Sequence, residues 1–190
     1  LKKTRGKLFC GNAGTTMRFL TAVLAAQPFE STITGDFRMK KRPIKDLVNA
    51  LKQLGAKIEY MGKNGYPPLK IKGPLLGGTC KVKGDISSQF LSGLLIAAPL
   101  SQNDIKIEVI GELVSKPYVD MTIQTMEKFG VKVTRNGYKK FIIKAGQKYL
   151  AKNFKIEGDA SSASYFWGIS ALTGEEIEIS NIPKNSLQAD

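Results

Sequence analysis

Three short runs in this sequence combine glycine, an Asn or Asp, and small hydroxyl-bearing residues: Gly11–Thr15, Gly84–Ser88 and Gly158–Ser162. Each run stands directly before a long apolar stretch, a pattern typical of the start of a helix. The first turn of a helix carries unpaired backbone N–H groups and the positive end of the helix dipole. Small residues leave these groups open to a ligand. The runs therefore predict the binding of anionic groups such as phosphate or carboxylate.

The residues between these runs repeat as well. Apolar side chains recur at helical spacing over residues 44–54 and 119–129, which predicts two amphipathic helices at corresponding places. Each has a proline near its first turn and a glycine just past its end, as helix boundaries favour. These residues are Pro43 and Gly55 in the first copy and Pro117 and Gly130 in the second. The apolar stretches 17–26, 90–100 and 164–172 predict helices that are buried on nearly all sides.

Strands are predicted where apolar and polar residues alternate between these helices. They are residues 31–34, 56–60 and 69–72 in the first repeat, 106–110, 131–134 and 141–144 in the second, and 176–180 in the third. Asn64-Gly65 and Asn136-Gly137 predict hairpin turns. The sequence thus predicts an α/β fold made from a unit of buried helix, strand, amphipathic helix, strand and strand, roughly 75 residues long. Symmetry between such units would bring the starts of parallel buried helices together and form one shared anion-binding pocket.

Composition narrows the classes of function. The formal charge of +13 favours anionic partners, but no aromatic residues interleave with the basic clusters as nucleic-acid binding would require. There is no histidine and the two cysteines are isolated, which argues against a metal site, a disulfide framework or a His-based triad. No signal peptide is visible and residues 90–100 are too few to cross a bilayer, so we expect a cytoplasmic protein without a membrane contact. The chain begins without methionine, and we expect it to be a piece of a longer protein.

Five motifs occur in order along the chain. They are the Gly-Asn-Ala-Gly-Thr run within residues 8–20, Arg42-Pro43 with Leu54-Gly55-Ala56, Ser87-Ser88-Gln89-Phe90, Ser115-Lys116-Pro117-Tyr118, and residues 157–165. Together they closely resemble the 5-enolpyruvylshikimate-3-phosphate (EPSP) synthase family over nearly the whole chain. The resemblance implies βαβαββ repeats, three to a domain, in the inside-out α/β barrel of the enolpyruvyl transferases. It also implies that residues 1–156 form most of the first, substrate-phosphate-binding domain, and that residues 157–190 open the second domain after a crossover. The repeat pattern itself loosens over residues 147–155, where we expect a hinge or domain crossing.

The resemblance implies an activity too. The family transfers the enolpyruvyl group of phosphoenolpyruvate to the 5-hydroxyl of shikimate 3-phosphate and releases phosphate, without a metal or organic cofactor. The implied partners are these two small anions, with no nucleic acid and no membrane, and the implied enzyme is a monomer. The family's catalytic lysine and its acid and base residues have no counterpart in this chain. We therefore assign no catalytic residue and expect the chain alone to be inactive.

The resemblance also implies a set of substrate-binding residues. Those for shikimate 3-phosphate are Ser87, Ser88, Gln89, Ser115 and Tyr118, and those for phosphoenolpyruvate are Gly14, Arg42 and Gln89. The physics of each side chain fits its role. The serine pair adds hydroxyl groups to a helix start, which suits a phosphate. Gly14 lets a ligand approach the backbone closely. Arg42 stands before a proline that favours an extended backbone, from which its guanidinium can grip a carboxylate or phosphate.

Several neighbours receive lesser roles. We expect Asn12 to cap or turn the chain, and Arg18, on an otherwise apolar helix, to need a partner near the anions. Arg38 and Lys40 are expected to tune the local field without direct contact. Asp159, Ser161 and Ser162 repeat the anion-binding pattern, and we assign them to structure. Phe19 stands where many family members have proline or leucine, so it could reshape the back of the phosphoenolpyruvate pocket.

Two alternatives remain open. The UDP-N-acetylglucosamine enolpyruvyl transferases share the fold and the Arg-Pro helix, but they carry a reactive cysteine shortly before that pair, and residues 32–41 contain none. The Ser-Ser-Gln motif favours shikimate 3-phosphate instead. The second alternative is a basic nucleic-acid-binding module, which the net charge permits. Steep loss of oligonucleotide affinity with salt would support that module, and no binding at moderate salt would remove it.

Overall fold

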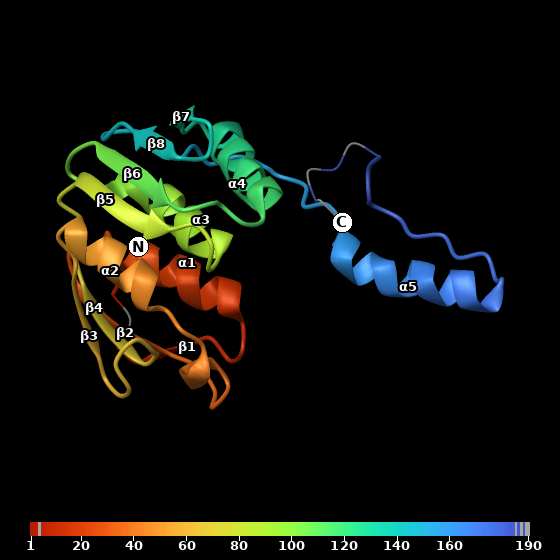
Figure 1. Ribbon diagram of the computed structural model, residues 1–190, viewed down its shortest axis with the longest axis horizontal. Coiled ribbons are helices and arrows are strands. Elements are labelled where there is room, and N and C mark those ends of the chain that lie inside the picture. The colour runs from red at the N-terminus through yellow and green to blue at the C-terminus, as the bar shows by residue number, and fades with distance from the viewer. Residues whose placement is uncertain (4, 185, 187, 189–190) are drawn as a thin grey trace. The chain divides into compact units, whose positions relative to one another are not determined.

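A computed structural model describes residues 1–3, 5–184, 186 and 188 (Figure 1). The chain divides into two compact units, Leu1–Leu150 and Ala151–Asp190. Among the described residues, the first unit holds two sheets and helices α1 to α4, and the second holds helix α5 (Ala160–Thr173). None of the helices in the described ranges is long and apolar enough to span a membrane.

The first unit contains two successive sets of elements. The first set is β1 (Leu8–Phe9), α1 (Gly14–Ala25), β2 (Glu30–Thr34), the 3-10 turn η1 (Met39–Lys41), α2 (Lys45–Gln53), β3 (Lys57–Tyr60) and β4 (Leu69–Lys72). The second set is β5 (Gly78–Lys83), α3 (Ser88–Ala97), the 3-10 turn η2 (Ala98–Leu100), β6 (Ile105–Ile110), α4 (Lys116–Lys128), β7 (Thr134–Asn136) and β8 (Lys140–Ile143).

The two sets fold into sheets of the same topology. The strand orders are β1-β2-β4-β3 and β5-β6-β8-β7. In each sheet the first two strands are parallel, and the remaining two pair antiparallel. Because a parallel pair requires a crossover connection, α1 and α3 each join two neighbouring parallel strands. The predicted βαβαββ repeat is therefore confirmed for the first two copies.

The core of this unit lies around the two crossover helices. Helix α3 is buried over most of its length, including Phe90, Leu94 and Leu95, as the sequence predicts. Strands contribute alternate side chains: in β6, Ile105 and Ile107 are inaccessible to solvent. Each fully buried Leu, Ile or Phe side chain stabilises the fold by about 1.5–3 kcal/mol. The same burial fixes the positions of the residues at the helix starts.

The amphipathic helices α2 and α4 form as predicted. Helix α2 contacts β3 of the first sheet and β5 of the second, so its apolar side, including Leu47 and Leu51, is fully covered. Both helices end at a glycine in the left-handed region, Gly55 with φ 99° and Gly130 with φ 87°. This conformation is costly for other residues, which explains glycine at both helix ends.

The structure contains two strands, β1 and β5, that were not predicted from the sequence. β1 has two residues, too few to show alternation. β5 does alternate, with Cys80 and Val82 buried and Thr79, Lys81 and Lys83 exposed, but it follows the glycine- and proline-rich residues 73–77. That composition is typical of a loop. The buried positions 80 and 82 are the signal that could have identified this strand.

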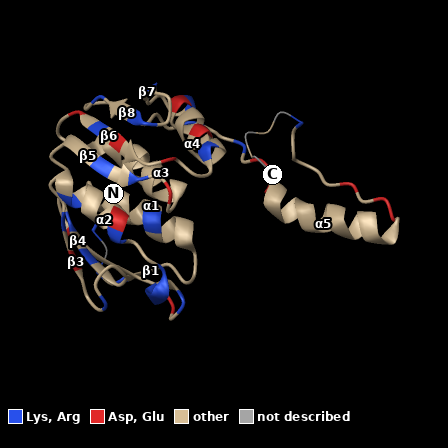
Figure 2. Ribbon diagram, in the orientation of Figure 1, with Lys and Arg blue, Asp and Glu red and all other residues tan. Residues whose placement is uncertain are grey.

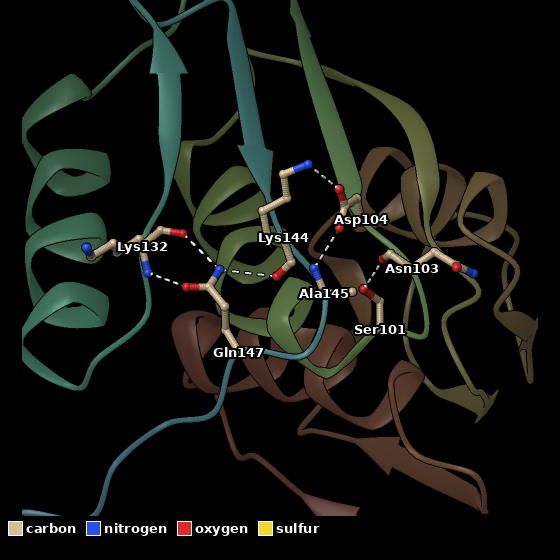
Figure 3. Close-up of polar contacts among 7 residues, drawn as sticks. All are labelled: Ser101, Asn103, Asp104, Lys132, Lys144, Ala145 and Gln147. Atoms are coloured by element: carbon tan, nitrogen blue, oxygen red, sulfur yellow. Dashed lines mark hydrogen bonds and ion pairs between the residues drawn. The ribbon is translucent and has the colours of Figure 1, made fainter.

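The predicted strand over residues 131–134 is wrong in its position, because β7 begins only at Thr134. The carboxamide of Gln147 takes the place of a strand partner at Lys132 (Figure 3). Its Oε1 accepts from the Lys132 backbone N–H at 2.7 Å, and its Nε2 donates to the Lys132 carbonyl at 3.0 Å. The Gln147 side chain therefore pairs with the backbone N–H and C=O of Lys132, which a neighbouring strand would otherwise bind.

Asp104, at the start of β6, holds the end of β8 in the same region (Figure 3). Its carboxylate accepts from Lys144 Nζ at 2.7 Å and from the Ala145 backbone N–H at 2.8 Å. These hydrogen bonds favour the ionised carboxylate and lower the pKa of Asp104 below its usual value. The contact ties together two strands that are far apart in sequence.

The second unit differs from the prediction in two ways. Helix α5 carries no charged residue (Figure 2), yet only Ala160 and Ala163 are buried in it. Its large side chains are exposed: Tyr165, Phe166, Trp167, Ile169 and Leu172. Residues 176–180 form no strand. A strand needs a second strand to pair with, and the described residues of this unit contain no other strand. The predicted burial and the predicted strand are therefore both wrong here.

Candidate functional site

Helices α1 and α3 pack side by side and run in the same direction. Near their starts, Gln89 Nε2 of α3 donates to Thr15 Oγ1 of α1 at 3.1 Å. One turn further on, a Cβ added to Gly93 of α3 would lie 3.3 Å from the Arg18 carbonyl oxygen and 3.5 Å from the Ala22 Cβ. Successive contacts thus advance along both helices together. The first two helix starts lie together, as the repeat predicts.

The start of α1 carries no capping side chain. Its N-cap is Ala13, so Asn12 does not cap the helix, but it does lie in a turn, which the Ala13 backbone N–H closes by donating to the Cys10 carbonyl at 3.0 Å. Asn12 acts instead through its backbone carbonyl, which accepts from Arg42 Nη1 at 3.1 Å. The N-cap of α1 therefore supplies no side chain to its first-turn N–H groups, an arrangement that suits an anion.

Gly14 and Arg42 lie against each other although they are far apart in sequence. A Cβ added to Gly14 would lie 2.8 Å from Arg42 Nη1 and 3.4 Å from Arg18 Nη1. The loop that carries Arg42 is held to the first run, because the Asp36 backbone N–H donates to the Gly11 carbonyl at 3.1 Å. Glycine at position 14 thus leaves room for two guanidinium groups beside a helix start.

Arg18 extends this cluster to the second repeat. Its Nη1 donates to Gln89 Oε1, and its guanidinium carbon lies 5.3 Å from the centre of the Phe90 ring. Partial burial lowers the pKa of Arg18, and the positive charge of Arg42 lowers it further. Two like charges therefore stand close together at the point where the helix starts meet.

Ser87 and Ser88 stand at the start of α3. Ser87 is the N-cap in an extended conformation, and its Oγ accepts from the Gln89 backbone N–H at 3.3 Å. Ser88, the first residue of the helix, is 6% exposed. The helix start is thus built from two hydroxyl groups beside Gln89.

Ser115 and Tyr118 lie at the start of α4. The loop before Ser115 is bound to the second run, because the Val114 backbone N–H donates to the Gly84 carbonyl at 3.0 Å. Ser115 has a left-handed backbone with φ 53°, uncommon for a residue other than glycine, and its side chain makes no capping hydrogen bond. Tyr118 is exposed rather than part of the core. The starts of α3 and α4 are therefore neighbours through their loops.

Comparisons with known proteins assign these features to a family. The family model described as EPSP synthase (3-phosphoshikimate 1-carboxyvinyltransferase) matches residues 2–190. The chain belongs to the EPSP synthase family. The 3-phosphoshikimate 1-carboxyvinyltransferase of Vibrio vulnificus is 53% identical over 186 residues, which cover 97% of this chain and 44% of that protein. That of Actinobacillus pleuropneumoniae serotype 3 is 52% identical over 188 residues, covering 96% and 43%.

Solved structures agree with the family assignment. The EPSP synthase of Acinetobacter baumannii superposes with a TM-score of 0.75 at 32% identity, over 90% of this chain and 38% of that one. The chain thus has the α/β repeat fold of this family. It spans less than half the length of the curated relatives named above.

The third run, in the second unit, uses its polar groups locally. Asp159 is the N-cap of α5, and its carboxylate accepts from the Ser161 backbone N–H at 3.1 Å and from Ser162 Oγ at 2.5 Å. These bonds agree with the structural role expected for the three residues. This EPSP synthase family member therefore caps its third helix start with a carboxylate, whereas the N-caps of α1 and α3 are Ala13 and Ser87.

The remaining candidates lie on the first unit. Arg38 lies 5.8 Å from the centre of the Phe37 ring, and Lys41 lies 5.9 Å from it. Lys40 belongs to η1, and Phe19 is half-buried on α1. Within the described residues, no group of three or more His, Cys, Asp or Glu side chains could hold a metal ion. The chemistry available at the joined helix starts is therefore hydrogen bonding and positive charge.

Proposed function

We propose that this chain is part of an enzyme that transfers the enolpyruvyl group of phosphoenolpyruvate to the 5-hydroxyl of shikimate 3-phosphate and releases phosphate. Membership of the EPSP synthase family supports the reaction class. The observation that carries the proposal is the cluster of Gly14, Arg42 and Gln89 where α1 meets α3. Two helix starts and two guanidiniums in one place suit a pair of small phosphorylated substrates.

The shikimate 3-phosphate side of the proposed site is the start of α3 with the neighbouring start of α4. Ser87 and Ser88 would donate hydroxyl hydrogen bonds to the phosphate, and first-turn N–H groups would add to them. Ser115 would reach the same phosphate. The left-handed backbone of Ser115 supports this role, because strained residues that serve no capping function cluster at binding sites. Tyr118 would lie beside the shikimate ring.

The phosphoenolpyruvate side of the proposed site is the start of α1. Arg42 would hold a carboxylate or phosphate in bidentate fashion, and Gly14 would let that group reach the backbone. Gln89 would lie between the two substrates. No residue of this chain is proposed as the acid or base that the addition and elimination steps require. We propose that the chain alone is inactive.

The wider setting follows from the same proposal. Residues 1–156 would form most of the first domain, and residues 157–190 would open the second. The compact unit that ends at Leu150 supports a boundary near there. We further propose a cytoplasmic, monomeric enzyme that uses neither a metal nor nucleic acid. The two free cysteines, Cys10 and Cys80, are compatible with a reducing compartment.

Nuclear magnetic resonance of the ¹⁵N-labelled chain tests the proposal, because it detects weak binding. Shikimate 3-phosphate should shift the backbone amide signals of Ser88, Gln89 and Tyr118 in a saturable way. Shikimate, which lacks the phosphate, is the matched control and should leave these signals in place. The same titration with UDP-N-acetylglucosamine and with a single-stranded oligonucleotide at moderate salt covers the two alternatives.

Unmoved signals with shikimate 3-phosphate would contradict the proposed function. Saturable binding of UDP-N-acetylglucosamine would favour the other enolpyruvyl transferase. Oligonucleotide affinity that falls steeply with salt would instead favour the nucleic-acid-binding module.

A further inference from the structure

Arg18 is an unusual residue for the middle of a core helix. It is half-buried between Met17, which is 1% exposed, and the apolar side of α3. None of the ion pairs formed by the described residues includes Arg18. Partial burial lowers the pKa of Arg18, and the like charge of Arg42 lowers it further. A partly desolvated cation without an acidic partner destabilises a fold, so stability does not explain this residue.

What Arg18 does hold is the side chain of Gln89. Its Nη1 donates to Gln89 Oε1, while Gln89 Nε2 donates to Thr15 Oγ1 at 3.1 Å. A carboxamide can be turned over by rotation about its last bond, which exchanges its donor and acceptor ends. The Arg18 guanidinium can only donate hydrogen bonds, so it pairs with the oxygen of the carboxamide and not with its NH₂ group. Arg18 therefore decides which way the carboxamide faces.

The packing of the helices makes this contact possible. Gly93 allows the α3 backbone to approach Arg18 closely, since even a Cβ there would lie only 3.3 Å from the Arg18 carbonyl oxygen. Phe90 directly follows Gln89 in the sequence, and its ring lies beside the Arg18 guanidinium. Arg18 is thus held by the ring and by the carboxamide together, and its own position is defined.

We propose that Arg18 is a positioning residue that fixes the carboxamide of Gln89 between the two substrate subsites. This inference rests on the proposed function, because Gln89 matters only if both subsites bind ligands there. Arg18 acts through Gln89, so the effect of removing Arg18 depends on the presence of Gln89. Its charge costs stability, so its removal leaves the chain no less stable.

A double-mutant cycle on the ¹⁵N-labelled chain tests this inference. The variants are Arg18→Met, Gln89→Ala and the combination, with Arg18→Lys as the conservative substitution. Methionine keeps the length of the side chain without its charge. Arg5→Met, at the exposed start of the chain, is the control with the same loss of one positive charge. The measurements are the Gln89 side-chain amide signals, the dissociation constant for shikimate 3-phosphate and Tm.

The expected results are specific. In the unaltered chain the Gln89 side-chain amide gives two separate signals away from the positions of exposed glutamines; Arg18→Met moves them to those positions and Arg18→Lys keeps them apart. Arg18→Met weakens shikimate 3-phosphate binding roughly three- to tenfold, the range of one hydrogen bond. The double variant binds no more weakly than Gln89→Ala alone. Tm of Arg18→Met does not fall, and Arg5→Met changes none of the three readouts.

Other results overturn the inference. Additive losses in the double variant, unmoved Gln89 signals, or a lower Tm that accompanies the weaker binding would each show that Arg18 does not act through Gln89. If Arg18→Met leaves shikimate 3-phosphate binding unchanged, the inference about Arg18 is overturned but the proposed function is not. Absence of binding by the unaltered chain would remove the proposed function first, and the inference with it.

Discussion

Replacing Gly14 with alanine gives the sharpest test of the proposed phosphoenolpyruvate subsite. Gly14 is outside the left-handed region, so alanine meets no backbone strain there. The new Cβ would lie 2.8 Å from Arg42 Nη1 and 3.2 Å from its Cζ. Ordinary contacts between such atoms begin near 3.5 Å, so the guanidinium must move by about 0.7 Å. That movement lengthens its 3.1 Å hydrogen bond to the Asn12 carbonyl.

The cost of Gly14→Ala should fall on binding rather than on folding. Arg42 is exposed, so losing one hydrogen bond lowers the free energy of unfolding by about 1 kcal/mol or less. A guanidinium displaced by a large fraction of an ångström, with a methyl group in the subsite, should weaken phosphoenolpyruvate binding by about tenfold to a hundredfold. Shikimate 3-phosphate, placed at α3, should lose less than about threefold.

Parallel titrations of the chain with the two ligands measure this difference. Gly62→Ala is the matched control, because its Cβ would make only an ordinary contact, 3.7 Å from Pro68 Cδ. It should change neither affinity. Equal losses for both ligands in Gly14→Ala would refute the placement of the two subsites on separate helices. A large fall in Tm would show that the substitution acts through folding instead.

Four further predictions follow from the structure. Arg42→Ala should lower kcat/KM for phosphoenolpyruvate in the complete enzyme by more than tenfold, because a bound substrate would cover the exposed Arg42 guanidinium, and losing a charged partner desolvated in this way costs roughly 2–5 kcal/mol; a tenfold or smaller loss would contradict the role. Burial raises the pKa of Cys80 to about 12, so at pH 8 iodoacetamide should modify the half-buried Cys10 first and Cys80 only after unfolding in urea. An unfolded cysteine thiol ionises near pH 8.5, so the stability that neutral Cys80 contributes should be complete below that pH and fall as the pH rises toward 12. The urea midpoint should therefore be lower at pH 10 than at pH 7, and an unchanged midpoint would contradict this prediction. Gly73→Ala should lower the free energy of unfolding by at least the roughly 1–3 kcal/mol typical of overpacking, since its Cβ would lie 2.1 Å from the Ala25 carbonyl oxygen, and an unchanged urea midpoint would exclude that clash.

The repeat could be predicted from the sequence because its signals are local. Helix starts, amphipathic spacing and the glycines after α2 and α4 depend on a few neighbouring residues each. The strand over 131–134 could not be placed correctly, because its outcome depends on Gln147, whose side chain competes with a backbone partner. The apolar character of α5 indicated burial, but burial depends on what packs against a helix and not on its own composition.

The candidate site shows the same division. The sequence predicts the helix starts and the resemblance to the family names Gly14, Arg42 and Gln89 as site residues. The structure adds the contacts that bring residues of different repeats together, such as the hydrogen bond from Gln89 to Thr15. Arg18 drew attention only as a charge on an apolar helix. Its partner could not be inferred, because the register between two packed helices depends on Gly93 and on side-chain shape.

The close approach of α1 and α3 at Gly93 has a consequence for any ligand that touches both helices. Two backbones in near contact slide past each other only by compressing atoms, so the interval between Gly14 and Ser88 is set before a ligand arrives. A molecule that reaches both helix starts must match that interval with its own length. At the proposed site, the chain would therefore select ligands by the distance between their negative groups as well as by their charge.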